Sequence, residues 1–188
     1  AADEVAPALR PARFGPVFGA TVHQAIGLLL RELALGPAEA VRIAAAHTGL
    51  AADSPSTLLA EAAADVARAW QALAAEGLAR PPGPDLRLEY PVAGPGPAGT
   101  LVAGYADLVA VTGDRVDVLD FKTDLPPPGP VEAAYPEYVR QVRLYAELLE
   151  AAGLLSGRRL RCGLLFTGDG RIRWLSVYTD IDSQARRS

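Results

Sequence analysis

The spacing of the apolar residues changes once along the chain, at the Pro- and Gly-containing segment 80–85. Before this segment, apolar residues recur every three or four positions, as they do along one face of an α-helix. After it, in segments such as 86–90 and 115–122, apolar and polar residues alternate, which indicates β-strands. Helices followed by strands, with a further helix among the strands, predict an α/β domain with a mixed sheet.

The helical part is divided by residues that begin or end helices. Helices are predicted over residues 19–35, 38–47 and 54–75. Gly36-Pro37 ends the first of them, and Ser54-Pro55 offers an N-cap followed by Pro at the first helical position of the third. Segment 80–85 then separates this part from the strands.

The second part alternates strands with turns. Strands are predicted over residues 86–90, 101–111, 115–122, 160–167 and 171–178, with a helix over 136–152. Residues 93–99 are expected to form a Gly/Pro loop, and residues 126–130 a rigid exposed loop. Gly113-Asp114 makes a turn that pairs the second and third strands as a hairpin.

The length and composition fit one compact domain, because half of the 188 residues are hydrophobic. We expect this domain to span 13–180, with a helical part over 13–80 and a core over 85–180, between tails at 1–12 and 181–188. No apolar run is long enough to cross a bilayer and no signal segment opens the chain, so we expect a soluble cytoplasmic protein without a membrane partner. The absence of Met indicates a piece of a longer protein or a processed chain.

Charge and cysteine content exclude several kinds of site. The single cysteine, Cys162, excludes a disulfide within the chain and a four-cysteine iron–sulfur cluster, and its apolar surroundings predict a buried structural thiol. The net charge of −4 is not typical of a free-standing DNA-binding protein. Several Arg pairs could form a local strip along phosphates or simply a solvated surface. No Gly-rich phosphate-binding loop is present, so the chain alone is not an ATPase.

The predicted strand 115–122 ends in two charged residues that share a face. Asp120 and Lys122 are two positions apart, so their side chains point to the same side of a strand, together with two valines. Burying charge on such an apolar face costs free energy unless the charge is paired or used. The pair is therefore either a half-exposed ion pair at a strand end or part of a reactive site.

Asp107 is a second isolated charge, in the apolar strand 101–111. A hairpin centred on Gly113-Asp114 places position 107 opposite position 120, so Asp107 and Asp120 are expected to be near neighbours. Two carboxylates that close repel each other, and a divalent cation relieves the repulsion. Oxygen ligands favour Mg²⁺ or Mn²⁺, and Mg²⁺ between carboxylates commonly serves phosphoryl chemistry. Lys122 would orient the nucleophile or neutralise developing charge.

Short motifs follow one another in a recognisable order. They are Gly19-x-x-x-His23, Glu89 in an apolar strand, Gly104-x-x-Asp107, Asp120-Phe-Lys122-Thr and Tyr138-x-x-Gln141-x-x-x-Tyr145. In this order they resemble the PD-(D/E)XK nuclease superfamily. More narrowly, residues 14–178 resemble the RecB-type nuclease domain of bacterial helicase–nucleases, such as RecBCD and the AddA subunit of AddAB.

The resemblance implies a fold and a set of residue roles. The fold would be restriction-endonuclease-like, with a mixed central sheet flanked by helices and an N-terminal helical segment that contributes to the site. The implied metal ligands are Asp107, Asp120, His23 and the carbonyl of Phe121. The other implied site residues are Lys122 as catalytic lysine, Glu89 as a further carboxylate near the metal or at a second one, and Gln141 and Tyr145 as residues that hold DNA or the nucleophile.

From the residues alone, the roles of several of these side chains stay open. His23 taken alone is better interpreted as an ordinary core or surface histidine, because nothing in its own helix demands a metal, and only the resemblance favours a ligand. Glu89 could be a solvent-facing strand residue, and Tyr145 could belong only to the core.

The implied function is Mg²⁺-dependent hydrolysis of DNA, as an exonuclease on single-stranded DNA. The expected partners are a helicase motor in the same parent chain and a second helicase–nuclease subunit, in the processing of double-strand-break ends for recombinational repair. Two alternatives remain: a stand-alone nuclease with another nucleic acid substrate, and an inactive nuclease-like module that only binds DNA or a partner. Retention of both Asp residues and Lys122 argues against the inactive module.

Overall fold

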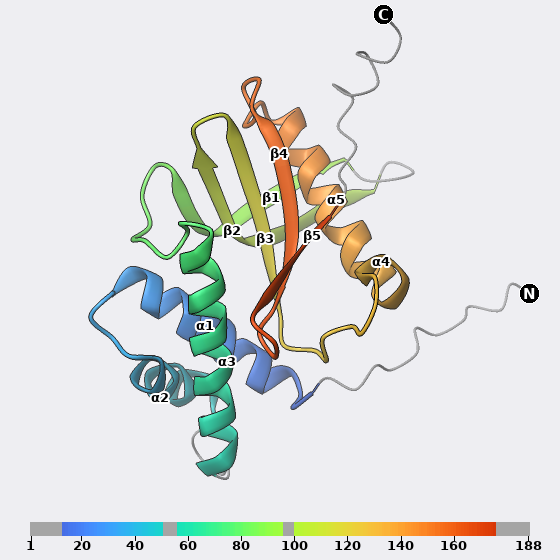
Figure 1. Ribbon diagram of the computed structural model, residues 1–188. Coiled ribbons are helices and arrows are strands. Elements are labelled where there is room, and N and C mark those ends of the chain that lie inside the picture. Colours follow the sequence, from blue (N-terminus) through green and yellow to red (C-terminus); the bar gives the residue numbers. More distant parts are fainter. Residues whose placement is uncertain (1–12, 51–55, 96–99, 176–188) are drawn as a thin grey trace, which may run out of the picture.

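The computed structural model describes residues 13–50, 56–95 and 100–175. Within these ranges the chain forms an α/β fold, as expected: three helices, a five-stranded mixed sheet and a flanking helical segment (Figure 1). The predicted tails at 1–12 and 181–188, the Ser54-Pro55 cap and residues 176–178 of the last predicted strand lie outside the described residues. No helix in the described ranges combines the length and apolar character needed to span a lipid bilayer.

The sheet places its strands in the order of the sequence. The strands are β1 (Leu86–Pro95), β2 (Leu101–Thr112), β3 (Arg115–Lys122), β4 (Arg159–Phe166) and β5 (Arg171–Leu175). Neighbouring strands are antiparallel except β3 and β4, which are parallel. The helical segment between β3 and β4 makes this parallel connection possible, because parallel strands require a long crossover.

The N-terminal helices α1 (Pro16–Arg31), α2 (Pro37–Thr48) and α3 (Ser56–Ala75) pack together, with α2 against α1 and α3. Their buried side chains form one cluster with those on one face of the sheet. Helix α1 begins three residues before the predicted start, because Pro16 is well suited to the first position of a helix. It also ends earlier than predicted, at Arg31 rather than near residue 35. The last apolar residues that reach the core from α1 are Leu29 and Leu30, whereas Leu33 is exposed, so a further turn would bury little.

The opposite face of the sheet is covered by α5 (Pro136–Ala151), which follows a short helix, α4 (Val131–Ala134). Helix α5 was predicted within one residue, whereas α4 was not predicted. Strand β1 is also longer than predicted and includes residues 93–95, which had been placed in a loop. The strand tolerates its prolines because it lies at the edge of the sheet, where backbone N–H groups need no ladder partner.

The alternation of side chains is reversed at one point shared by β1 and β2. Leu88 and Leu108 pair with each other and pack toward the N-terminal helices, whereas the next pair, Tyr90 and Ala106, packs toward α5. Residues two apart on a regular strand face the same side. The reversal therefore occurs at the residues between these pairs, Glu89 and Asp107, and Glu89 has a positive φ of 49°.

The hairpin of β2 and β3 has the predicted register. Leu108 pairs with Leu119, so Asp107 and Asp120 come opposite each other where the ladder ends. Gly113 in the turn has a positive φ of 55°, which glycine adopts without steric cost. The hairpin thus brings the two isolated aspartates to one end of the sheet, beside α1.

A buried ion network fixes the N-terminal helices to the end of β4. The carboxylate of Asp65, on α3, is fully buried and accepts hydrogen bonds from Arg13, Arg68 and the hydroxyl of Thr167. The backbone N–H of Thr167 donates in turn to the carbonyl of Lys122 at 2.9 Å. This network holds the last residue of β3 from the side of the helices.

Candidate active site

The end of β3 carries a buried pair of opposite charges. The Nζ atom of Lys122 lies 2.6 Å from Oδ2 of Asp120, and both side chains are largely buried. They share a face of β3, as the spacing predicted. Oδ2 of Asp120 is buried, and the charged group that it contacts is the Lys122 ammonium. Two opposite charges buried together at the end of a strand require an explanation, because taking them out of water costs free energy.

Helix α5 supplies the groups that hold the lysine. Nζ of Lys122 donates to Oε1 of Gln141 at 3.4 Å, and Nε2 of Gln141 donates to Oη of Tyr145 at 2.9 Å. The ammonium also lies 3.9 Å from the centroid of the Tyr138 ring, a cation–π contact. The hydroxyl of Tyr138 donates to Asp124 at 2.6 Å, which fixes the ring. Three residues of one helix therefore position the ammonium.

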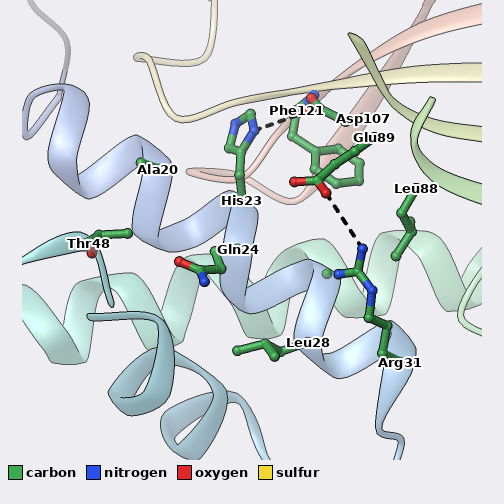
Figure 2. Close-up of a pocket in the computed structure, with 11 residues that line it drawn as sticks. Ala20, His23, Gln24, Leu28, Arg31, Thr48, Leu88, Glu89, Asp107 and Phe121 are labelled. Atoms are coloured by element: carbon green, nitrogen blue, oxygen red, sulfur yellow. Dashed lines mark hydrogen bonds and ion pairs between the residues drawn. The ribbon is translucent and has the colours of Figure 1, made fainter. Parts of the chain in front are cut away.

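Asp107 connects β2, β3 and α1. Its Oδ2 accepts a hydrogen bond of 2.6 Å from the backbone N–H of Phe121, and its Oδ1 lies 3.3 Å from Nδ1 of His23 (Figure 2). The side chain thus takes the place of a ladder acceptor where β2 leaves β3. The ring of His23 also meets that of Phe121 edge-on.

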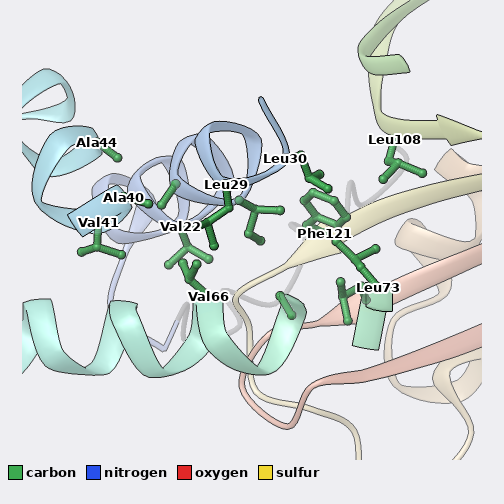
Figure 3. Close-up of a cluster of buried hydrophobic side chains, with 14 of the residues drawn as sticks. Val22, Leu29, Leu30, Ala40, Val41, Ala44, Val66, Leu73, Leu108 and Phe121 are labelled. Carbon is green, nitrogen blue, oxygen red and sulfur yellow. The ribbon is translucent and has the colours of Figure 1, made fainter. Parts of the chain in front are cut away.

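The side chain of Phe121 anchors this end of β3 in the core. Its ring packs among Leu30, Leu73 and Leu108, at the junction of the helices and the sheet (Figure 3). The backbone and the ring of Phe121 therefore both have structural roles, and a metal-binding role for its carbonyl stays a prediction.

The charges of these groups act on one another. Burial raises the pKa of Asp120, Lys122 opposes this effect, and the nearby carboxylate of Asp107 adds to it. Burial lowers the pKa of His23, but its bond to Asp107 and the charges of Asp107 and Asp120 outweigh burial and raise the pKa above its ordinary value. The two aspartates therefore form a region of negative potential between α1 and β3, where a cation is stabilised.

Comparison with protein families identifies the chain. A model of the PD-(D/E)XK nuclease superfamily matches residues 3–184. The protein belongs to the PD-(D/E)XK nuclease superfamily. The match covers almost the entire chain, and the observed fold agrees with the restriction-endonuclease-like architecture of that superfamily. No curated protein matches the chain closely enough to identify a relative.

PD-(D/E)XK nucleases typically use Mg²⁺. Within the described ranges, no three His, Cys, Asp or Glu side chains lie close enough together to form a metal site by themselves. Mg²⁺ does not require such a cage, because it is usually held by one or two carboxylates, water and substrate phosphates. The carboxylates of Asp120 and Asp107, which lie opposite each other where the β2–β3 ladder ends, fit two such ligands.

The predicted site residues of this PD-(D/E)XK nuclease fall into two contacting groups. One contains His23, Asp107 and the backbone of Phe121, and the other contains Asp120, Lys122, Gln141 and Tyr145. Glu89 lies beside the first group, across a cavity shared with His23 and Asp107, and its ion pair is with Arg31 at 3.6 Å. The structure therefore places Glu89 near the site, and its role there stays a prediction.

Sequence reasoning missed several residues that support the candidate site. Asp65 and Thr167 hold the backbone of Lys122, and Asp124 fixes the Tyr138 ring. Gly104 belongs to one of the recognised motifs, and a Cβ at this position would overlap the hydroxyl of Tyr145. The presence of Gly104 and Tyr145 in matching motifs was the one signal that could have suggested a contact between them.

Proposed function

We propose that the protein is a Mg²⁺-dependent deoxyribonuclease that hydrolyses phosphodiester bonds of single-stranded DNA. Its superfamily implies a nucleic acid substrate and phosphodiester chemistry. The observation that carries the proposal is the buried Asp120–Lys122 ion pair, opposite Asp107. A protein that used these residues only for stability would gain little from them, because the cost of desolvating a buried ion pair offsets most of its Coulombic gain.

Asp107 and Asp120 are the residues that would hold Mg²⁺, together with water and substrate phosphate. The resemblance implies His23 and the Phe121 carbonyl as further ligands, and His23 and both carboxylates would have to lie closer together than they do in this structure. When bound, Mg²⁺ would supply Lewis-acid chemistry to the scissile phosphate and to the attacking water. The bond from the Phe121 N–H to Asp107 fixes one carboxylate toward the other. The charge of Asp107 also raises the pKa of His23, so cation binding and protonation of His23 compete.

Lys122 is the residue that acts on the substrate. Gln141 and the Tyr138 ring hold its ammonium beside the carboxylate of Asp120. From there the positive charge stabilises the additional negative charge on the phosphate oxygens as water attacks phosphorus and the bond to the leaving oxygen breaks. Because Tyr145 fixes Gln141, α5 keeps the ammonium in place before the substrate arrives.

The proposed biological context follows from the resemblance to RecB-type domains. In that context the protein is the exonuclease domain of a helicase–nuclease and processes double-strand-break ends for recombinational repair. A motor in the parent chain, with a second subunit, would deliver the DNA. The net charge of −4 is consistent with delivery by a partner, since a protein that captures DNA alone is usually strongly basic.

The test of the chemistry is degradation of end-labelled single-stranded DNA in Mg²⁺. Asp120→Asn and Lys122→Met should each lower the rate at least about 100-fold, the scale of losing a group that stabilises transition-state charge. Asp114→Asn is the matched control, because Asp114 lies on the same hairpin but is 73% exposed and paired with Arg159. Equal cutting by the wild type and Asp120→Asn would exclude the proposed site. No cutting in Mg²⁺ or Mn²⁺, by this chain or its parent protein, would favour an inactive binding module.

The proposed context has a separate test. A Walker A motif, Gly-x-x-x-x-Gly-Lys-Ser/Thr, upstream in the encoding gene would identify the motor domain. Its absence there and from any co-encoded subunit would favour the stand-alone nuclease.

A further inference from the structure

A cavity of about 410 Å³ adjoins the candidate active site on the side of α1. Its wall includes His23 and Asp107 from the site, and it extends along α1 past Gln24 and Gly27 to Arg31 (Figure 2). Glu89, at the reversal point of β1, lies across from Arg31. The cavity thus continues from the proposed cutting centre, and a substrate strand that leaves the centre on this side would enter it.

Arg31 is the only Arg or Lys among the described residues that line this cavity. The guanidinium is loosely held: Nη2 lies 3.6 Å from Oε2 of Glu89, and the side chains of Arg31 and Glu89 are 50% and 74% exposed. Charge-assisted hydrogen bonds are about 2.7–2.9 Å long, and exposed ion pairs contribute little to stability. The guanidinium can therefore exchange Glu89 for another anion at small cost.

The geometry of α1 directs Arg31 toward the site. His23, Gly27 and Arg31 are spaced by four residues, so they lie along one face of the helix, and helical side chains lean toward the N-terminus. A Cβ at Gly27 would lie only 2.8 Å from Nη1 of Arg31. The absence of a side chain at Gly27 therefore leaves room for the guanidinium to lie back along the helix, toward His23.

We infer that Arg31 binds a backbone phosphate of the nucleic acid that neighbours the phosphate being cut. This inference rests on the proposed nuclease function and adds a binding position on the α1 side of the same site. A guanidinium matches the geometry of phosphate oxygens and retains its charge at any physiological pH. The alternative is a purely structural ion pair that joins α1 to β1, which would make Arg31 matter for stability and not for binding.

The test measures binding of a fluorescent single-stranded oligonucleotide by anisotropy, in Mg²⁺, with all variants made in Asp120→Asn to limit cutting. Arg31→Gln should weaken binding about 10-fold, the lower end expected for one charged hydrogen-bonding group. The slope of log K against log salt should fall by about 0.7, the value for one phosphate contact on a single strand. Arg42→Gln is the control, because Arg42 is 73% exposed on α2 and does not line the cavity. This variant should bind as the Asp120→Asn protein does.

Gly27→Ala tests position without changing charge. The Cβ displaces the guanidinium, so binding should weaken by a smaller factor than with Arg31→Gln. The fold should not suffer, because the displaced atom is the end of a flexible side chain and Ala favours helix more than Gly does. A melting temperature no lower than that of the Asp120→Asn protein would confirm this.

Several outcomes overturn the inference. The first is an Arg31→Gln variant with the affinity and salt dependence of the Asp120→Asn protein, and the second is an equal loss of affinity with Arg42→Gln. The third is unchanged binding by Gly27→Ala, which would mean that Arg31 acts only through the net charge of the protein and not through its position. Failure of the proposed function appears elsewhere, in the cleavage assay, where the wild type would not cut or Asp120→Asn would cut equally well. The binding measurements do not depend on cleavage and so separate the two failures.

Discussion

The absence of a side chain at Gly104 is predicted to control the groups that hold Lys122. A Cβ at this position would overlap the hydroxyl of Tyr145 and approach its Cζ and Cε1 atoms to 3.1 and 3.3 Å. The Tyr145 ring is buried, so it cannot turn away into solvent. Overpacking of this kind costs about 1–3 kcal/mol, and the loss of glycine's backbone freedom returns about 0.5–1 kcal/mol. Gly104→Ala should therefore lower the free energy of unfolding by about 0.5–2 kcal/mol.

A double-mutant cycle with Tyr145→Phe tests this explanation. Tyr145→Phe alone should cost about 0.5–1.5 kcal/mol, because it removes the acceptor of the Gln141 hydrogen bond. In the double variant the overlapping hydroxyl is gone, so the two costs should not add. The expected coupling is about 1–2 kcal/mol, within the range for residues in contact. Urea unfolding of the four proteins gives this number directly.

The cleavage rate should respond differently from stability. Gly104→Ala displaces Tyr145 and loosens Gln141, so the rate should fall about 10- to 100-fold, as misplaced catalytic groups typically cause. The double variant should recover stability but not rate, because Gln141 still lacks its partner. Gly83→Ala is the control, since a Cβ there meets nothing within 4 Å. Strictly additive stability costs for Gly104→Ala and Tyr145→Phe would refute the reasoning.

Three further predictions follow from the buried groups. Asp65→Ala should lower the free energy of unfolding by about 3–5 kcal/mol, because it leaves Arg13 and Arg68 without their buried carboxylate; a loss below about 1 kcal/mol in urea unfolding would contradict a buried ion network. Burial raises the pKa of Cys162 to about 12 from an ordinary value of 9.0, so its stabilising effect is complete below pH 9 and declines as the pH rises toward 12. Cys162→Ala should therefore lose less stability than the wild type between these pH values, which unfolding curves at several pH values would show. Chelation with EDTA should abolish DNA cleavage and excess Mg²⁺ should restore it, whereas cleavage that persists in EDTA would exclude the proposed role of Asp107 and Asp120.

The parts of the fold that were predicted from sequence are those determined by local pattern. Alternation gave the bounds of β3 without error, and the short turn at Gly113 determined the register that places Asp107 opposite Asp120. Local pattern was misleading where the tolerance of a strand for a residue type depends on the position of that strand in the sheet. Gly94 and Pro95 favoured a loop, yet both lie in β1, whose position at the edge of the sheet cannot be read from the strand itself.

The parts of the site that were not predicted depend on contacts between distant residues. Asp65 and Thr167 are 102 positions apart, and no spacing along the chain relates them. The reversal at Glu89 and Asp107 also left no trace in the alternation pattern, because helices cover both faces of the sheet and Leu88 and Tyr90 are therefore both apolar although they face opposite sides. The position of His23 beside Asp107 was anticipated only through the resemblance, since the packing of α1 against the sheet determines it.

The sequential order of the strands has a consequence for a chain that emerges gradually from the ribosome. Each strand pairs with the one made just before it, so the sheet can grow in the direction of synthesis without waiting for distant partners. The β2–β3 hairpin, and with it the bond from Phe121 to Asp107, can form early. The carbonyl of Lys122 gains its partner only when Thr167 appears, at the end of β4. A nascent chain would thus bring its two aspartates together before the lysine is anchored, and the finished nuclease would acquire its proposed cutting ability last.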